Sequence, residues 1–171
     1  MSDNTTKIGF GGGCHWCTEA IFQSLKGVNL VEQGWISSEG ENNYFSEAVI
    51  VHFEPTEINL ATLIEVHLYT HSCTSNHSMR KKYRSAVYYY SPDQKQSINK
   101  ILADLQSDFE DNIITKAYPL VAFKKSPENV QNYYLKDPNK PFCRRCIAPK
   151  LSLVLNKFGK EIFVERLTLN S

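Results

Sequence analysis

The sequence predicts one α+β domain in which helices pack on a mixed β-sheet as two layers. Three observations lead to this prediction. Strand-like and helix-like segments interleave along the chain in the order β-α-β-β-α-β-α-β-α. One strand pair is separated by only a short polar segment, which is typical of α+β domains. The chain has 171 residues, 42% hydrophobic and 22% charged, which suits a single soluble domain over residues 1–171.

Each strand is predicted from a run of β-branched, aromatic or alternating apolar residues. The strands are expected over residues 7–11, 28–37, 46–53, 85–90 and 113–123. The segment SSEGENN lies between the second and third of these, so we expect those two strands to pair as an antiparallel hairpin.

Each helix is predicted from apolar residues at helical spacing and from its end signals. The helices are expected over residues 17–25, 59–69, 92–109 and 127–135. Thr18 and Glu19 favour the first turn of the first helix, and Gly27 ends it. Pro92 stands at a tolerated first-turn position of the third.

The C-terminal part of the chain is predicted to be irregular. The stretch KDPNKPFCRRCIAPK contains three prolines. We therefore expect residues 136–171 to wrap the surface, with either one more helix or a loose tail over residues 152–163.

Composition excludes several classes of function. A formal net charge of +1 gives no attraction to nucleic acid or to an anionic membrane. No apolar run approaches the roughly 20 residues of a membrane span. The N-terminal stretch MSDNTTKIGF lacks the features of a signal peptide. We expect a cytoplasmic protein, active as a monomer.

The five cysteines indicate redox chemistry or metal binding. Four of them form two C-x-x-C pairs, Cys14 with Cys17 and Cys143 with Cys146, whereas Cys73 is an expected bystander. One alternative is a structural zinc protein held by both pairs, although roughly 125 residues separate them, unlike a compact zinc ribbon. Another is a general thiol-disulfide oxidoreductase that uses the first pair.

Cys14 is the candidate nucleophile. It follows three glycines and stands where the first helix is expected to begin, so backbone N–H groups and the positive helix end favour its thiolate. The neighbouring Trp16 suits a small apolar substrate group such as a methyl. The alternatives are a cysteine packed under the helix and an ordinary core tryptophan.

Four segments together resemble the A-type peptide methionine sulfoxide reductases. "FGGGCHWCTEAIFQSLKGV" is similar to the family's active-site segment, whose motif is G-C-F-W-x-x-E, with Gly13, Cys14, Trp16 and Glu19 in register. "EAVIVHFEP", "YRSAVYYYSPDQ" and "NYYLKDPNKPFCRRCIAPKL" follow in the family's order. The resemblance covers nearly the whole chain and implies a ferredoxin-like α/β plait.

The resemblance also implies an activity, the reduction of methionine-S-sulfoxide, peptide-bound or free. The cysteine that matches Cys14 attacks the sulfoxide sulfur and becomes a sulfenic acid. A resolving cysteine then forms a disulfide with it, and thioredoxin reduces that disulfide. No metal and no organic cofactor is expected.

The resemblance assigns roles to further residues. Glu47 matches the glutamate that shares a proton with the sulfoxide oxygen, and Tyr83 matches a hydrogen-bond donor to the same oxygen. Cys143 stands at the resolving position. Cys146 either relays the disulfide outward or packs as an apolar residue, and Cys17 is an alternative partner of Cys14.

Three departures from the family pattern concern the substrate site. His15 replaces a phenylalanine of the methyl pocket, so a weaker apolar wall is expected. The segment between Trp35 and Glu47 is short, and Tyr44 is the candidate for a second oxygen-binding tyrosine. The segment NHSMRKK replaces one with an aspartate and brings three basic residues, either a solvated charge run or a changed substrate mouth.

Overall fold

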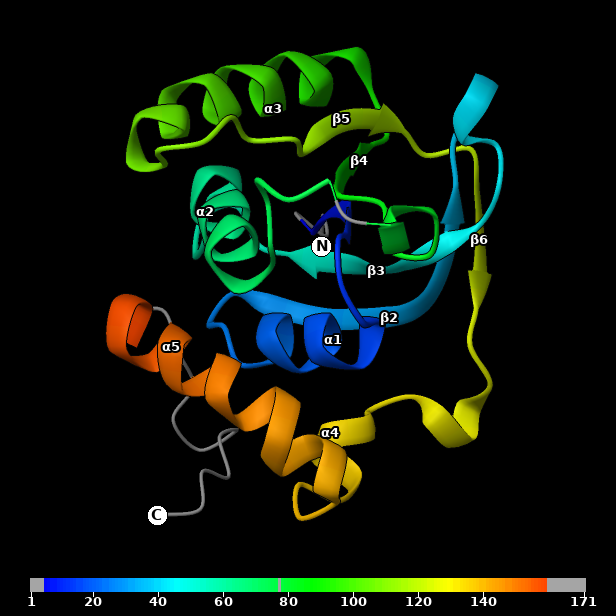
Figure 1. Cartoon of the computed structure of the whole chain (residues 1–171), viewed down its shortest axis with the longest axis vertical. Helices are drawn as coiled ribbons and strands as arrows, with labels where there is room; N and C mark the ends of the chain where they lie inside the picture. The colour runs from blue at the N-terminus through cyan, green and yellow to red at the C-terminus, as the bar shows by residue number, and fades with distance from the viewer. Residues whose placement is uncertain (1–4, 77, 160–171) are drawn as a thin grey trace.

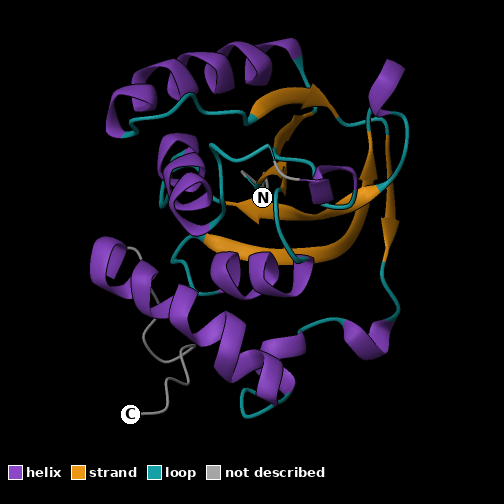
Figure 2. Ribbon diagram, viewed as in Figure 1, coloured by secondary structure: helices purple, strands orange, loops and turns teal. Residues whose placement is uncertain are grey.

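The computed structural model describes residues 5–76 and 78–159 and has a two-layer α+β architecture (Figure 1, Figure 2). Its six-stranded sheet has the order β5-β4-β1-β3-β2-β6. Neighbouring strands are antiparallel except β4 and β5, which are parallel. The strands are β1 (Thr6–Gly11), β2 (Val28–Ser37), β3 (Ser46–Phe53), β4 (Ala86–Tyr89), β5 (Lys116–Pro119) and β6 (Ala122–Lys125).

Five α-helices accompany the sheet. They are α1 (His15–Gln23), α2 (Leu60–Thr70), α3 (Pro92–Leu105), α4 (Tyr133–Lys136) and α5 (Ala148–Phe158). A π-helical turn, Cys143–Ile147, leads directly into α5. The run β1-α1-β2-β3-α2-β4, with central strand order β4-β1-β3-β2, is the ferredoxin-like plait that the resemblance implied. The predicted hairpin of β2 and β3 is also confirmed.

The main core lies between one face of the sheet and the helices. Ile8 and Phe10, two residues apart on β1, point into it, and Phe10 stacks on Phe22 of α1 at 4.5 Å between ring centroids. The other face has a smaller cluster that includes Ile36 and Tyr88, packed against residues 118–123. The face of the sheet that carries α1 therefore has the larger core. The chain passes from β1 into α1 on this face.

The single strand predicted over residues 113–123 is wrong, because two strands at opposite edges of the sheet occupy this region. The Leu120 N–H donates to the Tyr89 carbonyl and the Val121 N–H to the Ser37 carbonyl, both at 3.0 Å. Consecutive amides therefore bond to β4 and to β2, so the two sheet edges approach each other here. Pro119, which has no N–H to donate, stands at the change of partner.

The C-terminal segment is more regular than predicted. Within its described part, a π-helical turn and α5 replace the expected irregular chain, and α5 packs on α1 and α2. Pro149 is the second residue of α5, directly after the π-helical turn, and proline is tolerated in the first turn of an α-helix. Residues 160–163 of the predicted last helix lie outside the described residues.

Three other helix predictions differ in their limits. The helix expected over residues 92–109 ends at Leu105 and is followed by a 3-10 turn, Gln106–Asp108. The first helix begins at His15 rather than at residue 17. The helix expected over residues 127–135 is a 3-10 turn, Glu128–Val130, followed by the short α4. No helix among residues 5–76 and 78–159 is both long and apolar enough to cross a membrane.

Candidate active site

Side chains from later segments of the chain hold the loop that precedes α1. Gly12 has a φ of +150°, and a Cβ at this position would lie 2.5 Å from the Cδ2 atom of His71. His67 Nε2 lies 2.7 Å from the Gly11 carbonyl oxygen, and Arg80 donates to the Gly12 carbonyl at 3.0 Å. These contacts fix the backbone that delivers Cys14 to the helix end.

Cys14 stands at the N-cap of α1 with its side chain half-buried. A hydrogen bond from the Cys17 thiol lowers the pKa of Cys14 from 9.0 to about 7; the backbone N–H groups of Trp16 and Cys17 act in the same direction, against burial and the charge of Glu47. The pKa of Cys17 is raised, first because its proton serves that hydrogen bond and second because it is buried. Cys14 is therefore the more acidic thiol of the two, and Cys17 keeps its proton.

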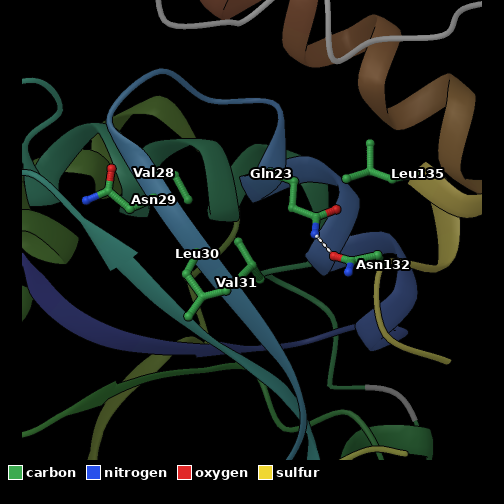
Figure 3. A pocket seen from close by; sticks show the side chains of 7 residues that line it. All are labelled: Gln23, Val28, Asn29, Leu30, Val31, Asn132 and Leu135. Atoms are coloured by element: carbon green, nitrogen blue, oxygen red, sulfur yellow. Dashed lines mark hydrogen bonds between the residues drawn. The ribbon is translucent and has the colours of Figure 1, made fainter. Parts of the chain in front are cut away.

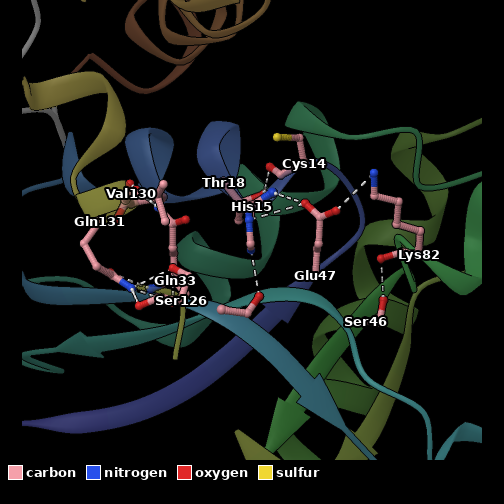
Figure 4. Close-up of polar contacts among 12 residues, drawn as sticks. Cys14, His15, Thr18, Gln33, Ser46, Glu47, Lys82, Ser126, Val130 and Gln131 are labelled. Atoms are coloured by element: carbon pink, nitrogen blue, oxygen red, sulfur yellow. Dashed lines mark hydrogen bonds and ion pairs between the residues drawn. The ribbon is translucent and has the colours of Figure 1, made fainter. Parts of the chain in front are cut away.

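Glu47 shares the same helix end (Figure 4). It lies at the start of β3 and is 7% exposed. The His15 N–H donates to Glu47 Oε1 at 3.2 Å, and Lys82 Nζ lies 3.5 Å from Oε2. The first-turn amides of α1 thus serve the carboxylate through the His15 N–H and the thiolate through the Trp16 and Cys17 N–H groups.

Lys82 connects Glu47 with Tyr83. The pKa of Lys82 is raised, first by a hydrogen bond with Tyr83 and then by the charge of Glu47. Tyr83 also lines a hollow of about 480 Å³ together with Gly12 and Gly13, the residues that precede Cys14. The structure therefore brings Cys14, Glu47 and Tyr83 to one place.

Trp16 belongs to an aromatic wall of three rings. It stacks on Tyr133 with 4.1 Å between centroids and 4° between planes, and it meets Phe142 edge-on at 5.5 Å. Sequence reasoning identified Trp16 but missed both partners, which lie more than a hundred residues away. The aromatic residues of the segment NYYLKDPNKPF were the only available signal.

Glu19 explains why Tyr133 reaches Trp16. Its side chain has no exposed surface and accepts from the Asn132 N–H at 2.9 Å and from the Tyr133 N–H at 3.1 Å. Gln33 donates to the same carboxylate at 2.8 Å. Burial raises the pKa of Glu19, and these hydrogen bonds oppose the rise. Glu19 thus links α1 to α4.

His15 lies on the buried side of the site. Its ring meets the Trp35 ring edge-on, with 5.2 Å between the ring centroids, and its Nδ1 atom lies 2.8 Å from the Gly34 carbonyl oxygen. Nε2 is 3.6 Å from Glu47 Oε1. The imidazole therefore faces the carboxyl group, in addition to standing next to Trp16.

Tyr44 is set apart from these residues. The Arg84 guanidinium lies 4.4 Å from its ring centroid, and both residues line a separate hollow with Tyr118. No contact of Tyr44 in the described part of the chain reaches Cys14 or Glu47. Its predicted role in binding the sulfoxide oxygen gains no support from this position.

The second C-x-x-C pair packs against α1 through the π-helical turn. Cys143 has no exposed surface, whereas Cys146 is half-buried. The charge of Cys146 contributes to the raised pKa of Cys17, so these two thiols are close enough to interact. All five cysteines are unpaired. Within residues 5–76 and 78–159 no cluster of three metal ligands forms, so the zinc alternative gains no support.

A further hollow, of about 290 Å³, lies where the end of α1 meets β2 and α4 (Figure 3). Its lining includes Leu30 and Leu135, which are about half exposed. It contains none of the predicted site residues.

Comparisons with known proteins identify the family. A model of the family "Peptide methionine sulfoxide reductase" matches residues 6–162. The peptide methionine sulfoxide reductase MsrA of Pasteurella multocida is 32% identical over 163 residues, which cover 87% of this chain and 94% of that protein.

Solved structures with the same fold include Mxr1 from Saccharomyces cerevisiae. Its reduced form has a TM-score of 0.71 at 22% identity and covers 82% of this chain and 90% of that chain. Mxr1 in complex with Trx2 has a TM-score of 0.59 at 21% identity and covers 76% and 85%.

Proposed function

We propose that this chain, which belongs to the peptide methionine sulfoxide reductase family, reduces methionine-S-sulfoxide to methionine with Cys14 as the nucleophile. The observation that carries the proposal is the shared helix end. The Cys14 thiol, with a pKa of about 7, and the Glu47 carboxyl group both bind first-turn amides of α1. The Trp16–Tyr133 wall stands beside them and suits the methyl group of the substrate.

In the first step the Cys14 thiolate attacks the sulfoxide sulfur. Glu47 gives a proton to the sulfoxide oxygen. The sulfur–oxygen bond of the substrate breaks, and this oxygen moves to the Cys14 sulfur. The Cys14 sulfur is oxidised by two electrons to a sulfenic acid, and the substrate sulfur is reduced by two electrons to the thioether. Tyr83 donates a hydrogen bond to the same oxygen.

In the second step a thiol displaces the oxygen of the sulfenic acid as water. We assign this first attack to Cys17, because its thiol already donates a hydrogen bond to the Cys14 sulfur. Cys146 interacts with Cys17 and is half-buried, so it suits an outward relay of the disulfide. The family pattern, in contrast, places the resolving cysteine at Cys143.

Thioredoxin then reduces the exposed disulfide. The Mxr1–Trx2 complex supports a partner of this class. A reducing compartment such as the cytoplasm suits the cycle, because it keeps cysteine thiols reduced. The steps require thiols and a proton donor, so the proposal invokes no metal or organic cofactor, and one chain supplies every group.

A single-turnover experiment tests the activity. Fully reduced protein is mixed with a peptide that contains methionine-S-sulfoxide, without added reductant, and methionine is measured. We expect methionine from the wild type and none from Cys14→Ser, whereas the R epimer, as a matched control, gives none with either. No methionine from the wild type with intact thiols would refute the activity.

Disulfide mapping of the same samples identifies the resolving cysteine. We expect a bond between Cys14 and Cys17 at early times, and its absence in Cys17→Ser. If Cys143→Ser alone prevents the first disulfide, the order proposed here is wrong and the family order holds. Steady-state turnover with thioredoxin and with dithiothreitol as reductants tests the relay. We expect Cys146→Ser to slow turnover with thioredoxin and not turnover with dithiothreitol.

A further inference from the structure

The His15 ring presents a defined tautomer to Glu47. A carbonyl oxygen only accepts hydrogen bonds, so the contact of 2.8 Å with Gly34 requires a proton on Nδ1. The neutral ring therefore carries a lone pair at Nε2, and Nε2 lies 3.6 Å from Glu47 Oε1. Two acceptors facing each other repel, and one added proton converts this contact into an attraction.

His15 and Glu47 are both buried, which strengthens such an attraction. His15 is 6% exposed and Glu47 is 7% exposed, so water screens the contact little. The His15 N–H also donates to the same Oε1 atom, which fixes the carboxyl group relative to the ring. Lys82 occupies the other oxygen from the solvent side.

We propose that His15 and Glu47 hold one catalytic proton between them, so that His15 is a positioning residue that keeps Glu47 supplied with its proton. This role rests on the proposed reductase function and deepens it. A phenylalanine at this position would keep an aromatic wall but would hold no proton. His15 would thus do more than replace that wall.

The proton balance of the cycle fits a pair with one proton. The pair takes the thiol proton of Cys14 and delivers it to the sulfoxide oxygen as the sulfenic acid forms. It then takes the thiol proton of Cys17 and delivers it to the departing hydroxyl as the disulfide forms. Two thiols and one sulfoxide become one disulfide, one thioether and one water, and the pair ends each step ready for the next.

The charged and titratable groups around the ring oppose and assist this role. Lys82 Nζ lies 3.5 Å from Glu47 Oε2, and the charge of Glu47 raises the pKa of Cys14. The groups are Glu47 from β3, Lys82 from the segment before β4, Cys14 and Cys17 from the start of α1, Lys150 from α5, and Lys124 from β6 beyond Trp35.

The test is the pH profile of single-turnover methionine formation in His15→Phe and His15→Gln. Glutamine keeps a donor for Gly34 but carries no exchangeable charge, so it separates proton holding from geometry. We expect the alkaline limb of the profile to move to lower pH in both variants. The expected loss at the alkaline end is about tenfold, within the usual contribution of a proton donor, with little change in KM for His15→Gln.

His52→Gln is the matched control. His52 of β3 lies 2.6 Å from Glu32 of β2, away from the site, so its loss should leave the profile unchanged. Melting curves show whether each variant folds, and His15→Gln carries the test if His15→Phe does not.

If the wild type forms methionine and both variants keep its pH profile while KM rises, His15 is only a pocket wall and the inference is wrong. If the wild type forms no methionine at any pH, the proposed function itself fails.

Discussion

The hydrogen bond from Cys17 is the largest cause of the low pKa of Cys14, so Cys17→Ala should raise that pKa. The backbone amides of Trp16 and Cys17 persist in the variant, because alanine keeps its N–H and favours the helix. They continue to stabilise the thiolate in part. The substitution therefore removes the hydrogen bond from the thiol and leaves the two backbone N–H donors in place.

The size of the effect follows from the shift. With a pKa of about 7 instead of 9.0, about half of Cys14 is thiolate at pH 7, against about 1% without the shift. Loss of the whole shift would lower the thiolate fraction about 50-fold. A thiolate two units more basic is about 6- to 10-fold more nucleophilic, so the net rate at pH 7 falls by at most about 5- to 8-fold.

The assay is alkylation of Cys14 by iodoacetamide as a function of pH, followed by mass spectrometry of the peptide that contains it. We expect the variant to be slower at pH 7 and faster than the wild type at high pH, so that the two profiles cross. Cys73→Ala, a change at a buried thiol that takes no part in the site, is the control. Unchanged midpoints in Cys17→Ala would refute the assignment of Cys17 as the donor.

Three further outcomes are expected. Glu47→Gln should lower the pKa of Cys14 further, because the charge of Glu47 opposes the thiolate; the midpoint of the alkylation profile should therefore move to lower pH, while single-turnover methionine formation falls at least about 100-fold. Glu19→Gln should destabilise the fold by about 2 kcal/mol in urea unfolding, because the new amide donors face the Asn132 and Tyr133 N–H groups. Tyr133→Leu should raise KM several-fold with little change in the alkylation rate of Cys14, since it removes the ring that backs Trp16; an unchanged KM would contradict the methyl-pocket assignment.

Local patterns in the sequence were sufficient for the start of the site. Three glycines followed by Cys14 and helix-favouring residues predicted a cysteine at a helix N-terminus, and this placement is confirmed. The interactions involved are between neighbours along the chain, which is why a pattern can show them. The positions of Glu47 and Tyr83 were expected from the family resemblance, since their contacts with the loop cross the sheet.

Long-range contacts were beyond what the patterns could show. Tyr133 meets Trp16 only because the buried Glu19 binds backbone amides of α4, a contact between residues 113 positions apart. Residues 113–123 have strand-forming composition throughout, yet the two halves bond to opposite edges of the sheet. Pro119 was the available warning, because proline cannot continue a hydrogen-bonded ladder.

The N-terminal end of α1 binds two anionic groups, the Cys14 thiolate and the Glu47 carboxylate, and these two groups repel each other. The charge of Glu47 raises the pKa of Cys14, so a thiolate and a carboxylate side by side work against the nucleophile. Sulfoxide reduction needs the opposite arrangement, with the negative charge on Cys14 and a proton available at Glu47. A proton held between His15 and Glu47 removes the repulsion and supplies the donor at the same time. This explains why an imidazole, buried and anchored to the Gly34 carbonyl, is compatible with the chemistry at a position where the family pattern has an aromatic hydrocarbon ring.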